Sequence, residues 1–137
     1  MINSRKISDL HPFVQDLCNK HVKACKDHGV ELLITSTYRD KASQDALYAQ
    51  HPKVTNAKGG QSFHNFRVAY DVVPVKNGKA IWNDDLLWAK VGELGKAFGL
   101  EWGGDFKSIK DMPHFQYTGG LTLADFNSGK LLSTKIV

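Results

Sequence analysis

Two histidines and one aspartate, far apart along the chain, are the residues of this sequence best suited to catalysis. His64 follows a glycine-containing loop, Asp71 lies seven residues later, and His114 lies near the start of an expected strand. Two imidazoles and one carboxylate can hold a catalytic zinc ion and leave a fourth position for water. Such an ion acts as a Lewis acid that activates water for hydrolysis. The spacing alone is not specific, because it matches no helical metal-binding motif.

Hydrolysis also needs a proton acceptor, and Asp111, three residues before His114, can supply it. Pro113 favours extended backbone at Met112, so a bend into the next strand can bring Asp111 and His114 to one cleft. Arg39 follows an expected strand directly, and it could stabilise an oxyanion or hold a substrate carboxylate in bidentate fashion. Taken singly, Asp111 would be an ordinary turn residue and Arg39 a surface arginine.

A second group of ligand-type residues, Cys18, His21, Cys25 and His28, is not expected to bind metal. At helical spacing these side chains form a stripe about 15 Å long. Zinc donors must instead lie within about 2.0–2.3 Å of one point. The stripe is therefore interpreted as a partly buried helix face. The two cysteines, about 10 Å apart along that helix, are too distant for a disulfide and are expected to be free thiols.

Four short motifs resemble the signatures of the zinc D-Ala-D-Ala carboxypeptidase and L-Ala-D-Glu endopeptidase family, and they occur along the chain in the same order as in that family. Residues 62–71 resemble its Ser-x-His-x-x-Gly-x-Ala-x-Asp signature, and residues 111–114 resemble its second signature, an acidic residue three positions before a histidine. Residues 36–39 resemble a Ser-x-Tyr-Arg element, and residues 102–106 a Trp-Gly-Gly-Asp-aromatic run. The resemblance implies the fold that these VanY-like peptidases share with lysostaphin and the hedgehog amino-terminal domain.

The resemblance also implies a role for individual residues. It implies that His64, Asp71 and His114 bind zinc. It makes Asp111 the general base and Arg39 the contact for a substrate carbonyl or carboxylate. Further residues are implied in substrate binding or in support of the metal ligands: Tyr38, Gln44, Ser62 and Asp105.

One position departs from the family pattern, because Arg67 stands where the signature has glycine. An arginine in left-handed backbone would be strained. We therefore expect ordinary backbone at this position, with the Arg67 side chain pointing outward. The departure bears on the path of the chain from His64 to Asp71.

The elements that must position these residues mix helices and strands without the rhythm of a parallel sheet. We expect helices over 8–28, 41–50, 84–98 and 122–127, strands over 31–38, 71–75, 79–82, 100–102 and 113–117, and a loop over 51–61. Asp40 and Asn83 are expected to cap helices, and Asn77-Gly78 predicts a hairpin. The expected fold class is α+β, a small antiparallel sheet with flanking helices.

Composition indicates one globular domain, with 137 residues of which 42% are hydrophobic and 23% charged. We expect a single catalytic domain over residues 1–137, monomeric and without a separate cell-wall-binding module. No apolar run approaches the ~18 residues of a membrane span, so stable membrane insertion is not expected. The net charge of +4 favours anionic partners such as the cell envelope. Basic residues are not clustered among aromatic ones, which argues against nucleic-acid binding.

The resemblance implies a peptidoglycan hydrolase, and the start of the chain lacks the apolar segment of a signal peptide. In these features the chain resembles phage endolysins, which are bacteriolytic and antimicrobial enzymes. These enzymes cleave the L-Ala–D-Glu bond of the peptide stem. Such enzymes stay in the host cytoplasm until a holin releases them to the cell wall. The alternative is a D-Ala-D-Ala carboxypeptidase, because the sequence does not distinguish an open groove from a closed one. A binding module without catalysis is a more remote alternative.

Overall fold

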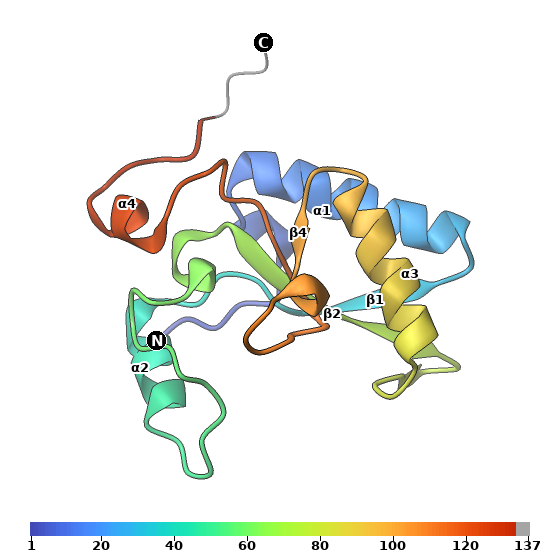
Figure 1. The fold of residues 1–137 in the computed structure, drawn as a ribbon, viewed down its shortest axis with the longest axis horizontal. Helices are drawn as coiled ribbons and strands as arrows, with labels where there is room; N and C mark the ends of the chain where they lie inside the picture. Colours follow the sequence, from blue (N-terminus) through green and yellow to red (C-terminus); the bar gives the residue numbers. More distant parts are fainter. Residues whose placement is uncertain (134–137) are drawn as a thin grey trace.

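The strands form an antiparallel sheet in which the strand carrying Asp71 lies between two neighbours (Figure 1). The structure is a computed structural model that describes residues 1–133. The strand order is β1-β2-β5-β4, and β3 pairs with β2. The strands are β1 (Glu31–Ser36), β2 (Ala69–Lys76), β3 (Lys79–Ala80), β4 (Glu101–Trp102) and β5 (His114–Gln116).

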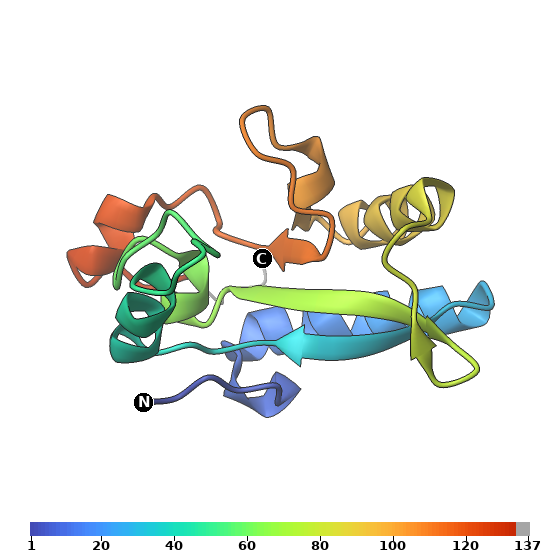
Figure 2. The same ribbon diagram turned by 90° about the horizontal axis from the view of Figure 1, so that it is seen from below.

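Helices flank this sheet, which confirms the expected α+β class. The helices are α1 (Pro12–Asp27), α2 (Lys41–Tyr48), α3 (Asp85–Lys96) and α4 (Leu123–Asn127), with 3-10 turns η1 (Ile7–Asp9), η2 (Phe63–Phe66) and η3 (Gly103–Asp105). Figure 2 shows β1 and β2 side by side with α1 behind them. His21 of α1 donates from Nε2 to the Val91 carbonyl of α3 at 2.9 Å, so the two helices are tied together beneath the sheet.

Alternation along β2 and β5 divides the sheet into a core face and a cleft face. Tyr70 and Phe115 are register partners, fully buried, with stacked rings 5.8 Å apart between centroids. The next register pair, Asp71 and His114, points to the opposite face, because successive strand residues alternate sides. A one-residue slip would bury the polar pair and expose the aromatic one, so burial of the aromatic pair fixes the register.

The start of the first helix differs from the expectation. Residues 8–11 do not belong to α1, because its first helical residue is Pro12 and the turn η1 precedes it. Proline is well suited to the first helical position, where its missing N–H has no partner to lose. The Nδ1 atom of His11 caps the helix by accepting from the Phe13 amide at 3.2 Å.

The other helix caps and the hairpin follow from local sequence, with one correction. Asp84, not Asn83, caps α3, since its Oδ1 accepts from the Leu87 amide at 3.0 Å. Asp40 caps α2 as predicted, through the Ser43 amide. The predicted turn at residues 77–78 also forms, with positive φ of 53° and 75° at its two positions.

The expectation of a single catalytic domain stays a prediction. Of the domain expected over residues 1–137, residues 134–137 lie outside the described residues. Cys18 and Cys25 are buried free thiols, as predicted. Within residues 1–133, none of the helices combines the length and apolar content that crossing a bilayer requires.

Candidate metal centre and substrate cleft

A short 3-10 turn positions His64 at the edge of the sheet. Ser62 begins this turn and forms a capping box with Asn65, so the turn is fixed at its first residue. The Asn65 side chain also donates to the Arg39 carbonyl at 2.9 Å, which ties the turn to the segment that follows β1. His64 donates from Nδ1 to the Thr37 carbonyl at 2.8 Å, and its Nε2 lies 3.3 Å from Asp71 Oδ1.

Sheet pairing brings the second histidine to the same carboxylate. Asp71 of β2 and His114 of β5 are direct register partners. His114 Nδ1 lies 3.1 Å from Asp71 Oδ1, and its Nε2 lies 2.7 Å from Gln116 Oε1. The two imidazole rings face each other in a T-shaped arrangement with centroids 5.1 Å apart.

These three side chains fit a metal ion. One donor atom from each of His64, Asp71 and His114 lies within 4.8 Å of the others. Each imidazole has one nitrogen engaged by another acceptor, which leaves the second nitrogen directed at Asp71. Two nitrogens and a carboxylate oxygen around one point are the donors of a catalytic zinc site. The structure therefore brings together all three residues that the sequence predicts as ligands.

Charge around Asp71 favours its ionised form. Burial alone would raise the pKa of Asp71, but the attraction of His64 and hydrogen bonds from both imidazoles hold that pKa well below its usual range. Burial likewise opposes the charged form of His114, yet the neighbouring Asp71 raises the pKa of His114 above its ordinary value. The centre holds a permanent negative charge between two imidazoles, an arrangement that favours a cation.

The Trp-Gly-Gly motif positions Asp111. A Cβ atom at Gly103 would collide with the Asp111 carbonyl oxygen, so only glycine allows the loop to return this closely. The Gly103 carbonyl accepts from the Asp111 amide at 2.9 Å, and Trp102 donates from its indole to the Met112 carbonyl at 2.8 Å. Burial raises the pKa of the Asp111 carboxyl, although His114 opposes this effect.

Arg39 lies at the same cleft and its guanidinium is fixed by two neighbours. It donates to Gln44 Oε1 at 2.9 Å and to Ser36 Oγ at 3.1 Å. Its Nε atom has no hydrogen-bond partner within residues 1–133. Burial lowers the pKa of Arg39, while Asp71 and Asp111 favour its charged form. A guanidinium remains charged in any case.

Two predicted residues lie outside the cleft. The Tyr38 ring is covered by the Arg67 guanidinium at 3.8 Å from its centroid. Asp105 pairs with Lys96 of α3 at 2.7 Å. Neither Tyr38 nor Asp105 lines the cavity around the two histidines, whereas Gln44 and Ser62 do.

The expectation of ordinary backbone at Arg67 is wrong, because this residue adopts left-handed backbone with φ of 65°, whereas its side chain is exposed as expected. Contacts far away in the sequence compensate for the strain. Its guanidinium stacks on Tyr38 and donates to the Asp9 carbonyl at 2.8 Å. Its own carbonyl accepts from the His11 amide at 2.9 Å. The chain from His64 to Asp71 thus keeps the glycine-type path that the signature requires.

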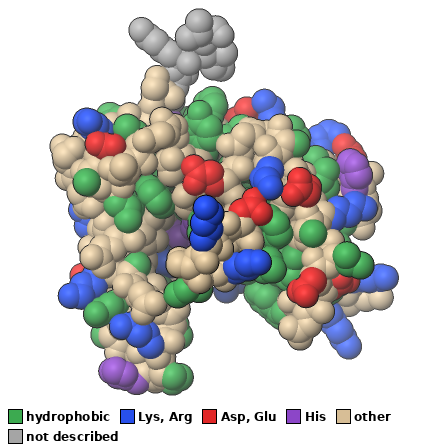
Figure 3. All heavy atoms as spheres, viewed as in Figure 1, with side chains coloured by type: hydrophobic (Ala, Val, Ile, Leu, Met, Phe, Trp, Pro, Cys, Tyr) green, Lys and Arg blue, Asp and Glu red, His purple; other side chains and the backbone are tan. Residues whose placement is uncertain are grey.

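The cleft continues beyond the histidines on more than one side. A cavity of about 330 Å³ is lined by Arg39, Asp71 and both histidines. It shares Asp111, His114 and Ser62 with a cavity of about 460 Å³. A further cavity of about 1050 Å³ shares Asp111 and is bordered by the exposed side chains of Val54 and Ile109. Figure 3 shows histidine side chains within a hollow between two raised parts of this face.

Sequence reasoning missed residues that support the ligands. Gln116 is buried and bonds to His114, and Thr37 bonds to His64 only through its backbone. Gln116 could have been noticed, because residues two apart on a strand share a face. No side-chain pattern could have revealed the backbone carbonyl of Thr37.

The helical stripe of cysteines and histidines behaves as a helix face. Cys18, His21 and Cys25 are buried in the core, while His28 is exposed. The Nδ1 atom of His21 accepts from the Tyr70 hydroxyl at 2.7 Å. Burial raises the pKa of Cys18 to about 12, so this thiol is a poor metal ligand.

Comparison with known proteins links this geometry to peptidases. The family model described as D-alanyl-D-alanine carboxypeptidase matches residues 55–117. The chain is 37% identical over 123 residues to the peptidoglycan L-alanyl-D-glutamate endopeptidase CwlK of Bacillus subtilis (strain 168), a match that covers 80% of this chain and 74% of CwlK.

Two further proteins share less with this chain. The L-alanyl-D-glutamate peptidase of Listeria phage A118 is 31% identical over 99 residues, which cover 67% of this chain and 32% of the phage protein. The chain therefore spans about a third of that relative. The crystal structure of the Serratia marcescens L-Ala D-Glu endopeptidase ChiX has the same fold, with a TM-score of 0.67, 24% identity, and coverage of 82% of this chain and 84% of ChiX.

Proposed function

The chain belongs to the D-alanyl-D-alanine carboxypeptidase family of metallopeptidases, and we therefore propose that it is a zinc-dependent peptidoglycan hydrolase. Its proposed reaction is hydrolysis of the L-Ala–D-Glu bond in the peptide stem. One observation carries the proposal: His64, Asp71 and His114 converge on one point, and each imidazole has its other nitrogen already engaged.

His64 Nε2, Asp71 and His114 Nδ1 would hold the zinc ion. Support comes from the donor set and from the orientation of both rings, which other hydrogen bonds fix before any ion binds. When bound, zinc supplies a Lewis acid that activates water at neutral pH. Because the pKa of Asp71 is held low, this ligand stays ionised and need not lose a proton on binding.

Asp111 is the proposed general base. Its carboxyl lines the same cavity as both histidines. Burial raises the pKa of Asp111, whereas the two neighbouring imidazoles lower the pKa of Asp71. Two carboxyl groups with such divergent pKa values can divide the roles of proton carrier and permanent anion. Asp111 takes a proton from the attacking water and delivers it to the leaving amine.

Arg39 is proposed to stabilise the carbonyl oxygen that gains negative charge during attack. Gln44 and Ser36 hold its guanidinium, so the positive charge is oriented before substrate binds. Gln44 itself donates to the Ala57 carbonyl at 2.8 Å, which connects this arrangement to the loop over 51–61. Ser62 caps the turn that carries His64, because its hydroxyl oxygen accepts a hydrogen bond from the His64 amide, and this contact supports the ligand.

The shape of the cleft favours an endopeptidase over a carboxypeptidase. An endopeptidase needs room for substrate on both sides of the scissile bond, whereas a carboxypeptidase needs a closed end with a charge for the terminal carboxylate. The cavity around the histidines continues into two larger cavities, each sharing Asp111 with it. This continuity supports cleavage within the stem, as does the similarity to CwlK.

We propose an endolysin role in phage lysis for this activity. The similarity to a phage peptidase supports it. On this proposal the domain works as a monomer, is released from the host cytoplasm to the wall, and is attracted to the anionic cell envelope by its net charge of +4.

Digestion of purified muropeptides, followed by mass spectrometry, tests the proposed reaction. Zinc-loaded enzyme is expected to produce a new D-Glu amino terminus. A chelator should abolish cleavage and added zinc should restore it. Release of a single alanine instead would establish the carboxypeptidase alternative.

Matched variants test the site itself. Asp111→Asn removes the base but keeps the shape of the side chain, whereas Glu93→Gln alters an exposed carboxylate on α3 that pairs with Lys96. Cleavage by the first variant should fall by about 10²- to 10⁴-fold, and the second should be fully active. Cleavage that survives chelation, or that persists in Asp111→Asn, would contradict the proposal.

A further inference from the structure

The two metal-binding imidazoles are oriented by different kinds of acceptor. His64 donates from Nδ1 to a backbone carbonyl, that of Thr37, which no side-chain substitution removes. His114 donates from Nε2 to the side chain of Gln116 at 2.7 Å. The orientation of His114 therefore depends on a residue that could be replaced, and that residue has a partner of its own.

The amide of Gln116 is held in one orientation by Glu101. The Gln116 Nε2 donates to Glu101 Oε2 at 2.9 Å. An ionised carboxylate can only accept, so the NH₂ group of the amide must face Glu101 and the oxygen must face His114. An amide oxygen also only accepts, so Nε2 of His114 must carry a proton. The other nitrogen, Nδ1, is then the one directed toward Asp71.

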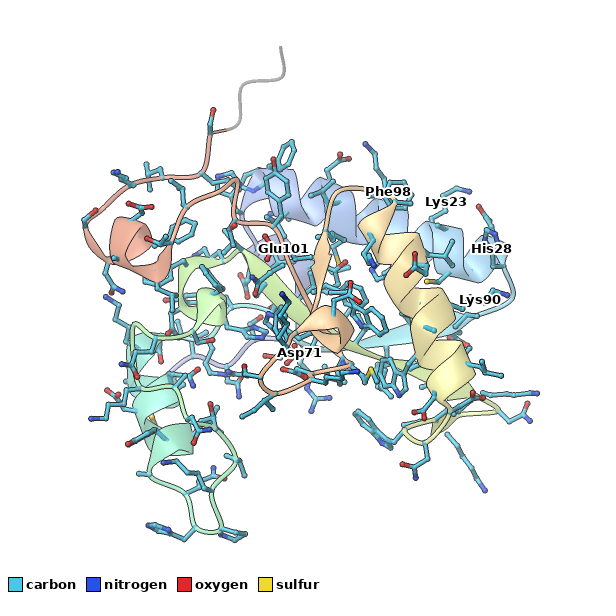
Figure 4. All side chains as sticks on the ribbon, viewed as in Figure 1. Lys23, His28, Asp71, Lys90, Phe98 and Glu101 are labelled. Carbon is cyan, nitrogen blue, oxygen red and sulfur yellow. The ribbon has the colours of Figure 1, made fainter. Side chains whose placement is uncertain are left out.

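Strand pairing builds this chain of hydrogen bonds. Gln116 lies two residues after His114 on β5, and Glu101 of β4 is its direct register partner. His114 and Gln116 are 8% and 5% exposed, so their hydrogen bond is shielded from water. Glu101 is exposed and keeps its charge solvated. Figure 4 labels Asp71 and Glu101, the first and last residues of this hydrogen-bond series, near the centre of the molecule.

We propose that Gln116 and Glu101 are positioning residues that select the Nδ1 atom of His114 as the metal ligand. The inference rests on the proposed metal site and adds residues beyond the ligands and the general base. Glu101 orients the Gln116 amide, the amide fixes the proton on Nε2, and the ring is held for binding. Hydrogen-bond partners of ligating histidines typically change metal affinity by about 10- to 100-fold.

Zinc affinity of the full chain, measured by competition with a chromogenic chelator, tests the proposal. Gln116→Met removes the acceptor while keeping an apolar side chain of similar length, and it should weaken zinc binding by about 10- to 100-fold. Glu101→Gln frees the Gln116 amide to rotate, and it should weaken binding by a smaller factor. Glu93→Gln is the control and should bind zinc like the wild type.

A double variant separates positioning from loss of packing. In Gln116→Glu alone, two carboxylates would face each other, so binding should weaken. Adding Glu101→Gln restores both hydrogen bonds, because the new carboxylate at 116 still accepts from His114 and now also accepts from the new amide at 101, so only the bond between positions 116 and 101 reverses its direction. Affinity should then return to within a few-fold of wild type. Failure of this rescue would overturn the proposal.

Nitrogen NMR of the zinc-loaded chain reports directly which nitrogen of each histidine binds the ion and which carries the proton. His114 should show zinc on Nδ1 and a protected proton on Nε2, and His64 should show the opposite assignment. In Gln116→Met the Nε2 proton of His114 should exchange faster with solvent. Zinc on Nε2 of His114 in the wild type would overturn the inference.

The outcomes also distinguish this inference from the proposed function. If the wild type binds no zinc, the proposed function fails before any variant is compared. If the wild type binds zinc and cleaves muropeptides while Gln116→Met binds equally tightly, only the positioning role is wrong. A raised KM with unchanged zinc affinity would likewise overturn it, since Gln116 also lines the cleft and would then be contacting substrate.

Discussion

Asp71 and His114 face each other across β2 and β5, with Asp71 Oδ1 3.1 Å from His114 Nδ1. The same oxygen lies 3.3 Å from His64 Nε2. One carboxylate therefore contacts both imidazoles, and the sheet register decides that it does.

Replacing one imidazole should remove the metal and the activity together. In His64→Ala the remaining donors are one imidazole and one carboxylate, which are too few for a stable zinc site. Elemental analysis of the purified variant should find zinc far below one equivalent. Ser43→Ala, a substitution within α2, is the control and should retain zinc. A His64→Ala protein with a full equivalent of zinc would contradict the ligand assignment.

Removing the proposed base should separate metal binding from turnover. Asp111→Asn keeps the side-chain volume but cannot accept a proton. Muropeptide cleavage should fall by about 10²- to 10⁴-fold, the range typical of general bases. Zinc content should stay at one equivalent. Cleavage within a few-fold of wild type would show that another group accepts the proton.

Loss of the Arg39 charge should slow catalysis with little effect on zinc. In Arg39→Gln the hydrogen bond to Gln44 can persist in part, but the positive charge beside the carbonyl oxygen is gone. Losing one such interaction typically lowers kcat by about 10²- to 10³-fold. Steady-state kinetics on a stem peptide would check this. A rise in KM alone would indicate that Arg39 binds a substrate carboxylate instead.

The two aspartates of the cleft should affect the pH dependence of stability in opposite ways. The pKa of Asp111 is raised in the folded zinc-free chain, so folding favours its protonated form. Its stabilising contribution is present below the ordinary pKa of 3.8 and is lost as the pH rises through the folded value. Asp111→Asn should therefore raise the melting temperature of the zinc-free chain at pH 7, and this gain should vanish in acid.

Asp71 should show the reverse sign in the same melting series. Its pKa is depressed on folding, so its contribution is present above the ordinary value of 3.8 and is lost as the pH falls through the folded value. Asp71→Asn should lower the melting temperature at pH 7. A shift in the same direction for both variants would contradict the assigned environments.

The left-handed backbone at position 67 should favour glycine over alanine. Both Arg67→Gly and Arg67→Ala lose the stacking on Tyr38 and the bond to Asp9. Only alanine retains the steric cost of positive φ. Urea denaturation should therefore find the glycine variant more stable than the alanine variant by about 1 kcal/mol. Equal stabilities would show that the turn relaxes to ordinary backbone when the arginine is removed.

Local sequence determined the main helix caps, the hairpin and the residue types that are suited to bind zinc. Asp40 caps α2 and the 77–78 dipeptide forms the hairpin because these features depend on residues within a few positions of each other. The candidate ligands could also be named from the sequence, because imidazole and carboxylate are the donors that zinc chemistry requires. The first helix and the cap of α3 were misplaced by one or a few residues, where several local signals compete.

Only the tertiary structure decided how those residues are used. Arg67 tolerates left-handed backbone because Asp9, 58 residues away, accepts a hydrogen bond from it. Tyr38 and Asp105 contact Arg67 and Lys96 instead of lining the cleft, and local sequence does not place these partners beside them. The nitrogen that His114 presents depends on Gln116 and on its cross-strand partner Glu101. Residue type determines which hydrogen bonds a side chain can make, but long-range packing determines which partner is within reach.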